Sequence, residues 1–547
     1  MLSDNKDIVS TEKSRREGIL SGVMLLAAST FLCKIIGLFF KIPIINIVGI
    51  DGMAYFSSAY NIYMLLNSIA AAGLPVALSI LVAKNRALGY TDNIKKIFFS
   101  ALTLFLLLGF AGTLLLYLGA DSYSKFIGIE ASAPAVKAIA PTLLFICISG
   151  AIRGYFQGHE IMLPTALSQL MESLGKLALG VGFALYAVKI GLDSSYTAAA
   201  AVIGLSAGVF LSVVYLFVRL LFFSRKANRI CSTDNSVKDG NKKILYDLFI
   251  IAFPITLSSC VTSLTSLADT ALITNRLVSG GFSSDAAVTL YSSYTNLAIP
   301  LFNLPPALIT AIGVSLIPAL TSAITRNAEG ESKKIFTSAV KLCNTFAIPA
   351  AAGIAVFAKP ILLAIYPNEA EACNFASPLL SILSAAIVFS CLTTVCNATL
   401  QAYMKPALPI ISMASGALIK IAVEYILVGS DIGIYGAPIS TVACTLTILV
   451  MDLIFIAIYT PQRVELFSLL KIFVSTAMSV GLSALLYKLL LGYDCSDLLT
   501  LAIAIISAIC LYIIFALLFG VVSYADMISL GVLNSLAKKM KKMKLIK

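Results

Sequence analysis

The sequence predicts an all-α, polytopic membrane protein with about fourteen transmembrane helices, and three observations lead to that prediction. Of the 547 residues, 59% are hydrophobic and 12% are charged, whereas soluble domains carry about 25% charged residues. The apolar residues form continuous runs of about 20 residues or more, the length that a helix needs to cross about 30 Å of hydrocarbon. Basic residues gather in alternate loops between these runs. The runs do not alternate polar with apolar residues, which argues against a transmembrane β-barrel.

Each expected span is one of these continuous apolar runs. In order, the spans cover residues 18–42, 56–82, 97–119, 138–156, 162–188, 196–222, 245–273, 291–324, 335–358, 378–402, 408–428, 435–459, 472–491 and 498–521. Basic residues before the first run resemble a secretory signal. That run is too long for a signal peptide, contains Lys34 and lacks a small-residue cleavage site, so we expect it to remain as a span.

The distribution of Lys and Arg predicts the orientation, since cytoplasmic loops are enriched in both. The N-terminal tail, the loops after even-numbered spans and the C-terminal tail hold most of these residues, and the other loops hold fewer, among them Lys125, Lys189, Arg276 and Lys359. We therefore expect a protein of the cytoplasmic membrane with both termini cytoplasmic. The net charge of +12 suits anionic membrane lipids as partners and requires no nucleic acid.

Cysteine and histidine usage predicts no metal centre. The eleven cysteines show no paired spacing and most lie within spans, where cysteine behaves as a small apolar residue. We expect neither disulfides nor a cofactor, and leave open a coupling to a monovalent cation or to the membrane potential. The oligomeric state also stays open, with a monomer as one option.

An internal repeat organises the chain. Residues 95–101 read KKIFFSA and residues 333–339 read KKIFTSA, so six of seven positions match at an offset of 238. Downstream, Gln157 and Lys176 are nineteen positions apart, as are Gln401 and Lys420. A repeat of six spans enters the membrane twice in the same direction, as in some transporters that bind substrate between the copies.

This repeat predicts the domain organisation. We expect a cytoplasmic tail at 1–17, a first lobe of six helices at 18–223, a cytoplasmic linker at 224–243, a second lobe of six helices at 244–460, two further helices at 461–522 and a basic cytoplasmic tail at 523–547.

Charged residues inside the expected spans are candidate site residues, because an ionisable group in a membrane must face protein or water. Lys34 and Lys41 lie seven positions apart on nearly one helical face, and Lys34 has no acidic residue within a turn. At an offset near 235, Lys34 corresponds to Asp269 of the seventh span. This correspondence predicts that the two side chains approach when the outer side of the protein closes, and the open alternative is that Asp269 only caps a helix or forms hydrogen bonds within its own lobe.

Two pairs and one single residue complete the charged candidates. Glu172–Lys176 and Lys420–Glu424 have the i, i+4 spacing at which helical side chains meet, so neutralisation within each pair is an open alternative to a role in binding. Arg153 closes the fourth span, where its side chain could instead extend to the membrane surface. Separately, Gly204 and Gly208 predict close helix packing.

Several motifs resemble the multidrug/oligosaccharidyl-lipid/polysaccharide exporter superfamily. The match is closest to its stage V sporulation protein B branch, which is related to MurJ-type lipid II flippases. The segments that carry it are KIIG at 34–37 with KIP at 41–43, AGLPVA at 72–77, RGYFQG at 153–158 and PTA at 164–166 with Gln169 and Glu172. The resemblance covers the first twelve spans in order.

The resemblance implies a flippase that moves a polyprenyl-pyrophosphate-linked saccharide across the cytoplasmic membrane by alternating access. Two lobes would rock about a cavity whose positive charge, Lys34 and Lys41 included, holds the pyrophosphate, with the lipid tail along spans 13 and 14. Many such flippases carry cavity arginines in the second and eighth helices. Here the corresponding polar residues are asparagines, namely Asn61, Asn67, Asn296 and Asn303. The glycan therefore stays open, with lipid II as one option.

Other functions compete with the flippase. A cation-coupled multidrug antiporter of the same superfamily would favour buried carboxylates without cavity lysines. A membrane-embedded transferase would need a carboxylate or histidine cluster, whereas the chain has one histidine, so we expect no enzyme. A non-transporting scaffold for wall or sporulation machinery remains an alternative.

Overall fold

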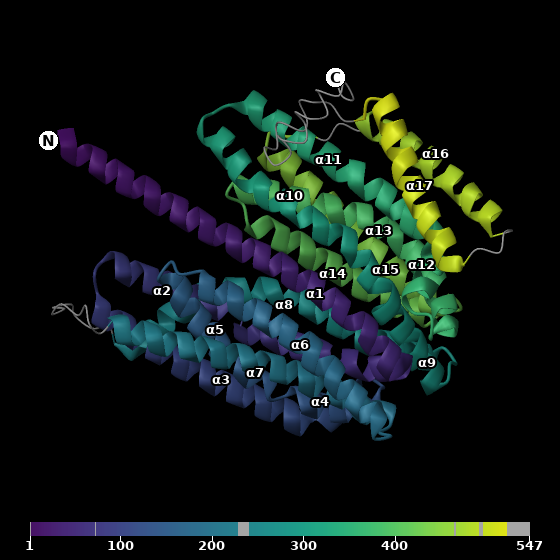
Figure 1. The fold of residues 1–547 in the computed structure, drawn as a ribbon, viewed down its shortest axis with the longest axis horizontal. Coiled ribbons are helices and arrows are strands. Elements are labelled where there is room, and N and C mark those ends of the chain that lie inside the picture. The colour runs from purple at the N-terminus through teal and green to yellow at the C-terminus, as the bar shows by residue number, and fades with distance from the viewer. Residues whose placement is uncertain (1, 72, 228–239, 464–466, 492–495, 522–547) are drawn as a thin grey trace. The chain divides into compact units, whose positions relative to one another are not determined.

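A computed structural model describes residues 2–71, 73–227, 240–463, 467–491 and 496–521 (Figure 1). Side chains are described from Ser29 onward, except for some residues of α1, α2, α7, α8, α10 and α16. The side chain of Lys34 is among those not described. Within these ranges every regular element is a helix. The all-α, polytopic membrane fold is therefore confirmed.

The described residues contain eleven helical segments long and apolar enough to cross a membrane. They coincide with all the expected spans except those at 18–42, 245–273 and 291–324. Helices run through these three spans as well, but each contains residues whose side chains lie outside the description. The count of fourteen stays a prediction.

Exposed apolar side chains support a lipid-facing surface. On helix α3 (Thr91–Phe126), Phe99, Leu107 and Phe110 are 62–65% exposed, while Phe98, Ala101 and Phe105 of the same helix are buried. A soluble protein rarely leaves so large an apolar stripe in water. The exposed stripe is the face that hydrocarbon would cover.

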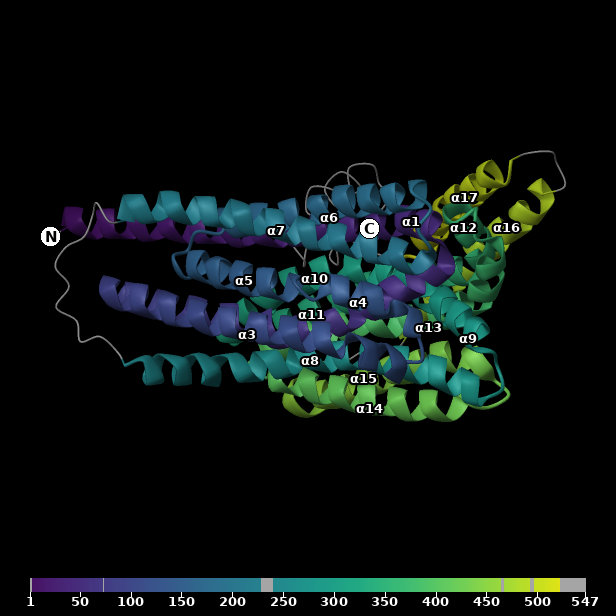
Figure 2. The same cartoon turned by 90° about the horizontal axis from the view of Figure 1, so that it is seen from below.

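The chain divides into two compact units, Met1–Ala271 and Leu272–Lys547. The first unit contains α1 (Leu2–Ala71), α2 (Gly73–Ala87), α3, η1 (Glu130–Ser132), α4 (Ala133–Ile139), α5 (Thr142–Gly158), α6 (Leu163–Lys189), α7 (Ser194–Ala227) and most of α8 (Asn241–Ser279). In this unit α5 packs against α2, α3 and α7, and Figure 2 shows α3, α5 and α7 running lengthwise beside one another.

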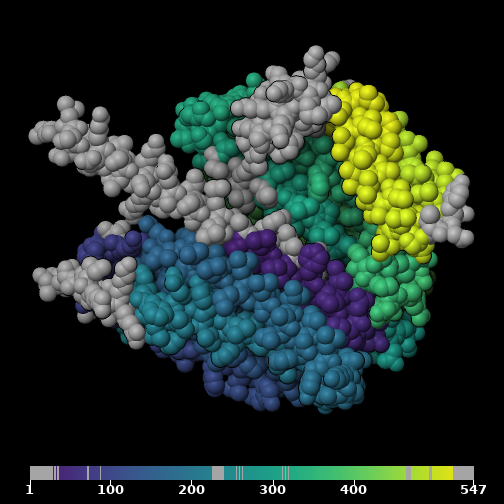
Figure 3. All heavy atoms as spheres, viewed as in Figure 1, coloured from purple at the N-terminus to yellow at the C-terminus, as the bar shows by residue number. Residues whose placement is uncertain are grey.

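The second unit begins with the end of α8. It continues with α9 (Ser284–Ser292), the π-helical turn η3 (Ser293–Ala298), α10 (Ile299–Thr325), α11 (Glu329–Val356), α12 (Ala358–Ile365), α13 (Ala370–Ala402), α14 (Ala407–Val428), η4 (Gly433–Tyr435), α15 (Gly436–Tyr459), α16 (Phe467–Leu490) and α17 (Asp497–Leu518). Helix α16 packs against α11 and α17 against α12, and both lie at the surface in Figure 3, in yellow.

Helix α8 falls mostly in the first unit, whereas the sequence places the boundary between lobes at residues 224–243. Polar contacts account for this: Asn61 Nδ2 donates to Thr270 Oγ1 at 2.9 Å, and the hydroxyls of Ser68 and Ser263 lie 2.7 Å apart. These contacts hold α8 against α1 in this conformation. The division into two lobes stays a prediction.

Helix boundaries keep the offsets of the sequence repeat. Helices α3 and α11 begin at Thr91 and Glu329, which differ by 238 positions. Helices α6 and α14 begin at Leu163 and Ala407, which differ by 244 positions. Both offsets equal those of the matched sequence segments, which supports the proposed repeat.

The helices are interrupted at a glycine between two expected spans and at a proline within another. Helix α1 runs through the first expected span and into the second, which ends in α2, and it breaks between the two spans at Gly49, whose φ of 77° and ψ of 172° favour glycine. The fourth expected span is divided into α4 and α5, with Pro141 directly before α5. Proline has no backbone N–H to donate, so it ends the preceding helix at little cost when it opens the next one.

Candidate anion-binding cavity

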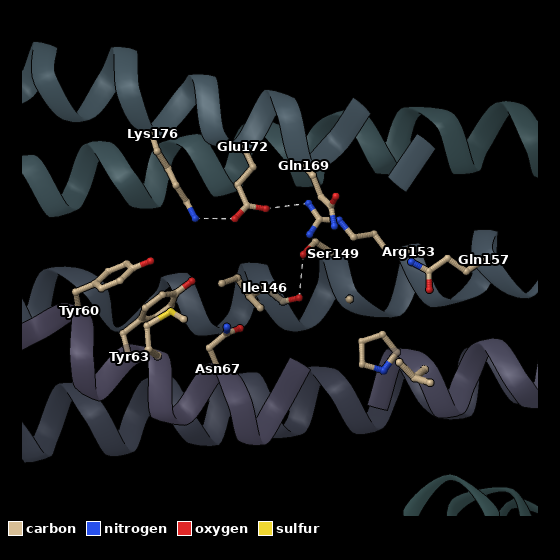
Figure 4. Close-up of a pocket in the computed structure, with 14 residues that line it drawn as sticks. Tyr60, Tyr63, Asn67, Ile146, Ser149, Arg153, Gln157, Gln169, Glu172 and Lys176 are labelled. Carbon is tan, nitrogen blue, oxygen red and sulfur yellow. Dashed lines mark hydrogen bonds and ion pairs between the residues drawn. The ribbon is translucent and has the colours of Figure 1, made fainter. Parts of the chain in front are cut away.

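Four helices of the first unit, α1, α2, α5 and α6, line a cavity of about 420 Å³ (Figure 4). Polar residues of α1, α5 and α6 line most of it. The lining comprises Tyr60, Tyr63, Met64, Asn67, Pro75, Val76, Ile146, Ser149, Gly150, Arg153, Gln157, Gln169, Glu172 and Lys176. Five of the sequence-predicted site residues are therefore brought together, namely Asn67, Arg153, Gln157, Glu172 and Lys176.

Helical periodicity explains why these residues share one space. On α5, Ser149, Arg153 and Gln157 recur every four positions, which places them on one face of the helix. On α6, Gln169 and Glu172 are three positions apart, and Lys176 follows four later. In Figure 4 the α6 residues point toward α5 and α1.

Glu172 links two basic side chains at the centre of the cavity. Arg153 Nη2 donates to Glu172 Oε2 at 2.8 Å, and Lys176 Nζ donates to Glu172 Oε1 at 2.7 Å. Arg153 also donates from Nε to Ser168 Oγ at 2.9 Å. The three charged side chains are 14–21% exposed. Glu172 therefore pairs with Arg153 of α5 as well as with Lys176 of its own helix.

Glycines set the helix spacing that positions these charges. A Cβ on Gly154 of α5 would lie 2.6 Å from the Pro75 carbonyl oxygen, so only glycine lets α5 approach α2 this closely. A Cβ on Gly208 of α7 would lie 2.4 Å from the backbone nitrogen of Lys176. The close packing predicted from Gly204 and Gly208 is confirmed, and it occurs directly behind Lys176.

Residues of α1 form the opposite wall. Tyr60, Tyr63 and Asn67 project from α1 toward α5 and α6 in Figure 4. The Oδ1 atom of Asn67 is buried and accepts no hydrogen bond from any described residue. A buried polar atom of this kind normally has a partner, so a ligand in the cavity would find an acceptor there.

The charges of the cavity favour an anion. Two cationic groups share one carboxylate, which leaves one net positive charge in a space that water enters only partly. Arg offers a planar fork of donors and Lys a point charge, the two groups that bind phosphate in proteins. Amide groups of Gln157, Gln169 and Asn67 add neutral hydrogen-bonding positions around them.

Lys41 lines a second, smaller pocket of about 160 Å³ in the same unit. Tyr60 and Lys176 line both spaces. Lys41 therefore lines a pocket that adjoins the cavity, and Lys176 lies where the two spaces meet. A ligand that extends past Lys176 would meet a further positive charge.

The remaining candidates of the first unit lie elsewhere. Asn61 contacts Thr270 and does not line the cavity. Asp269 is half-buried on α8. Because the Lys34 side chain lies outside the description, its role and its approach to Asp269 stay predictions.

The candidates of the second unit form separate environments. Lys420 and Glu424 are buried on α14, 6% and 1% exposed, and Ser440 Oγ donates to Glu424 Oε2 at 3.1 Å. Asn296 is buried in the π-helical turn and donates to Ser292 Oγ at 3.0 Å, while Asn303 is exposed.

Sequence reasoning missed several lining residues. Tyr60 and Tyr63 were detectable, because they precede Asn67 at positions i−7 and i−4 on one helical face. Ser149 stands four positions before Arg153 on α5. Ser168 had no such signal, since its role depends on how α5 meets α6.

Comparisons with known proteins agree with this fold. The sequence profile described as "Polysaccharide biosynthesis protein" matches residues 19–324, which is more than half of the chain, and a profile named MatE matches residues 254–426. Lipid II flippase MurJ of Bacillus subtilis (strain 168) is 27% identical over 74% of this chain and 76% of its own length. Stage V sporulation protein B of the same organism is 23% identical over 95% of this chain and 99% of its own length.

A solved structure has the same fold. "Lipid II flippase MurJ, inward closed conformation" superposes with a TM-score of 0.70 at 17% identity, over 92% of this chain and 100% of that one. The helical repeat, the membrane spans and the profile match lead to one assignment. The chain belongs to the polysaccharide biosynthesis protein family of the multidrug/oligosaccharidyl-lipid/polysaccharide exporter superfamily.

Proposed function

We propose that this protein is a flippase that moves a polyprenyl-pyrophosphate-linked saccharide across the cytoplasmic membrane by alternating access. The observation that carries the proposal is the cavity in which Arg153 and Lys176 face a space of about 420 Å³ inside a membrane helix bundle. A pyrophosphate needs such charge to leave water, because burying an unpaired ion is costly. The proposed role is transport, not catalysis.

The lipid tail needs an apolar surface, and the second unit offers one. A groove of about 420 Å³ between α11, α12, α16 and α17 is lined mainly by apolar side chains, among them Phe346, Phe357, Val480, Ile505 and Ile509. This is the part of the chain in which spans 13 and 14 lie. Its composition suits a polyprenyl chain, because the chain can move there from lipid tails that are equally apolar without entering water.

The membrane potential is a suitable driving force in this proposal. A headgroup with net negative charge moving from a negative interior to the outside gains about 2.3 kcal/mol per charge at 100 mV. A monovalent cation could supply the same coupling through the cavity carboxylate.

A cation-coupled drug antiporter is the second candidate, and one observation favours it. The second unit buries two carboxylates, Glu424 at 1% exposure and Asp452 at 0%. Such groups suit cation exchange. An antiporter predicts that an imposed proton or sodium gradient drives cationic dye uptake into vesicles, and a flippase predicts none.

Depletion in the native cell tests the proposed function. We expect an undecaprenyl-linked saccharide to accumulate on the cytoplasmic leaflet, and its identity would name the glycan. Wild-type protein should reverse the accumulation, and the Arg153→Ala, Lys176→Ala double variant, present at equal membrane level, should not. If no lipid-linked intermediate accumulates, the proposal fails.

A further inference from the structure

Glu172 occupies the place in the cavity that a bridging anion would take. Its two oxygens each accept from a different cation, Oε2 from Arg153 at 2.8 Å and Oε1 from Lys176 at 2.7 Å. A phosphate group likewise presents several anionic oxygens to neighbouring donors. The resting cavity therefore already contains an anion of its own.

A bound phosphate and Glu172 must compete for the same two cations. Arg153 donates a hydrogen bond from Nε to Ser168 and another from the terminal nitrogen Nη2 to Glu172. The ion pair of Lys176 in the described structure is with Glu172. A phosphate that enters between Arg153 and Lys176 meets the Glu172 carboxylate there, and repulsion between the two anions favours displacement of the carboxylate.

The displaced carboxylate would be left in an unfavourable environment. Glu172 is 14% exposed. Among the described side chains that line this cavity, the titratable groups besides Arg153 of α5 and Lys176 of its own helix are Tyr60 and Tyr63 of α1, and Lys41 of α1 lies in the adjoining pocket beyond Lys176. Behind α6 at this turn, α7 presents Gly208 and Leu211. Within the described part of the cavity, neither the tyrosines nor these residues of α7 replace the lost positive charge.

A carboxylate that loses its counter-ions in a partly dry site becomes neutral by binding a proton. The balance is simple: one proton from bulk water forms an O–H bond on the Glu172 carboxylate, and no other bond changes. Protonation also cancels the repulsion between the carboxylate and the incoming phosphate.

We propose that a phosphate-bearing headgroup displaces Glu172 from Arg153 and Lys176, and that Glu172 then takes up one proton, so that substrate binding is coupled to protonation. This inference rests on the proposed function, since it requires the cavity to bind phosphate. The proton lowers by one the net negative charge that crosses the membrane with the headgroup. Its release restores the Arg153–Glu172–Lys176 bridge when the headgroup leaves.

Isothermal titration of the full-length protein in detergent with farnesyl pyrophosphate tests the coupling. Titrations at one pH in buffers of different ionisation enthalpy give the number of protons exchanged on binding. The variants are Glu172→Gln, which cannot be protonated, and Glu172→Asp, which can. Glu160→Gln is the matched control, because Glu160 also pairs with an arginine, Arg86 at 3.3 Å, but lies outside the cavity.

The expected difference between wild type and Glu172→Gln is about one proton taken up per ligand bound. Because binding takes up a proton, affinity should fall as the pH rises. For each pH unit, the affinity of the wild type should fall about tenfold more than that of Glu172→Gln. Glu172→Gln should bind about 10- to 100-fold tighter, because a charged hydrogen-bonding competitor is lost. Glu172→Asp should keep the proton uptake, and Glu160→Gln should match the wild type.

Equal proton counts in wild type and Glu172→Gln would overturn the inference and leave the proposed function intact. Failure of the wild type to bind farnesyl pyrophosphate would overturn the phosphate site and the inference with it. If Glu172→Gln does not fold, the proton count of the wild type near pH 8 tests the coupling by itself. At this pH the ligand is fully ionised and has no proton to release. Zero net uptake there contradicts the coupling.

Discussion

At the scale of single residues, Arg153 contributes more than its charge. It reaches Ser168 with Nε and Glu172 with Nη2, so its planar fork contacts two residues of α6 at once. A lysine has one terminal nitrogen on a flexible stem and cannot make both contacts in the same geometry. Arg153 therefore fixes the direction in which the positive charge faces the cavity.

We predict that Arg153→Lys lowers the translocation rate about tenfold although the charge is retained, which corresponds to one lost charged hydrogen bond. The matched control is Arg86→Lys. Arg86 also forms an ion pair, with Glu160 at a distance of 3.3 Å, but this pair lies outside the cavity. The rate of lipid movement in proteoliposomes measures both. Equal rates for Arg153→Lys and wild type would contradict the role of the guanidinium fork.

Charge made part of the candidate cavity visible in the sequence. Arg153, Glu172 and Lys176 stand out because ionised groups are rare in apolar spans. Their mutual contact was not predictable, because the spacing of Glu172 and Lys176 already satisfied the pair within one helix. Only the packing of α5 against α6 brings the arginine to the same carboxylate. Lys34 remains a prediction at this scale.

At the scale of elements, the approach of α5 to α2 depends on a missing side chain. A Cβ at position 154 would lie 2.6 Å from the Pro75 carbonyl oxygen, a backbone atom that cannot rotate away. We predict that Gly154→Ala destabilises the protein by about 1–3 kcal/mol through overpacking. The same displacement would shift the neighbouring Arg153, so ligand affinity should fall as well.

Gly182→Ala provides the matched control. Gly182 lies on α6, and a Cβ at this position would meet no described atom of another helix within 4 Å. Alanine there should be neutral or stabilising by about 0.5–1 kcal/mol, because glycine is the poorer helix former. The apparent Tm in detergent distinguishes the two variants. If Gly154→Ala melts no earlier than Gly182→Ala, the close approach of α5 to α2 is not required.

Most helices were predictable from the length of their apolar runs, whereas the breaks within them depend on the backbone conformation of single residues. The break at Gly49 was not predictable, because nothing in the sequence distinguishes a glycine at φ 77° from one inside a helix. The fourth span does contain a helix-breaking residue, Pro141, which stands directly before α5. The short helix Ala358–Ile365 lies in a segment read as a loop, since eight residues are too few to span a membrane.

At the scale of the whole molecule, the orientation follows from the lysine and arginine distribution and stays a prediction. We expect a reporter that is active only in the cytoplasm to function when fused after Lys547. The same reporter inserted at Gly191, in the turn between α6 and α7, should be inactive. An exported reporter should give the opposite pattern. Activity of one reporter type at both positions would contradict the proposed topology.

The repeat was visible in seven residues of sequence and extends to the helix boundaries. Helices α3 and α11 begin 238 positions apart, the offset of the KKIF segments. The placement of α8 with the first unit could not be foreseen, because its contacts with α1 are hydrogen bonds of serine, threonine and asparagine side chains. Such residues are common in membrane helices and carry no partner information.

The central claim is that this chain translocates a polyprenyl-pyrophosphate-linked saccharide through a cavity governed by Arg153 and Lys176. The most direct measurement uses purified protein in liposomes that contain a fluorescent polyprenyl-pyrophosphate saccharide, with a membrane-impermeant quencher added outside. Wild-type protein should expose the inner-leaflet lipid to the quencher, while empty liposomes and the Arg153→Ala, Lys176→Ala variant should protect about half of the signal. Equal protection by wild-type protein and empty liposomes would contradict the account.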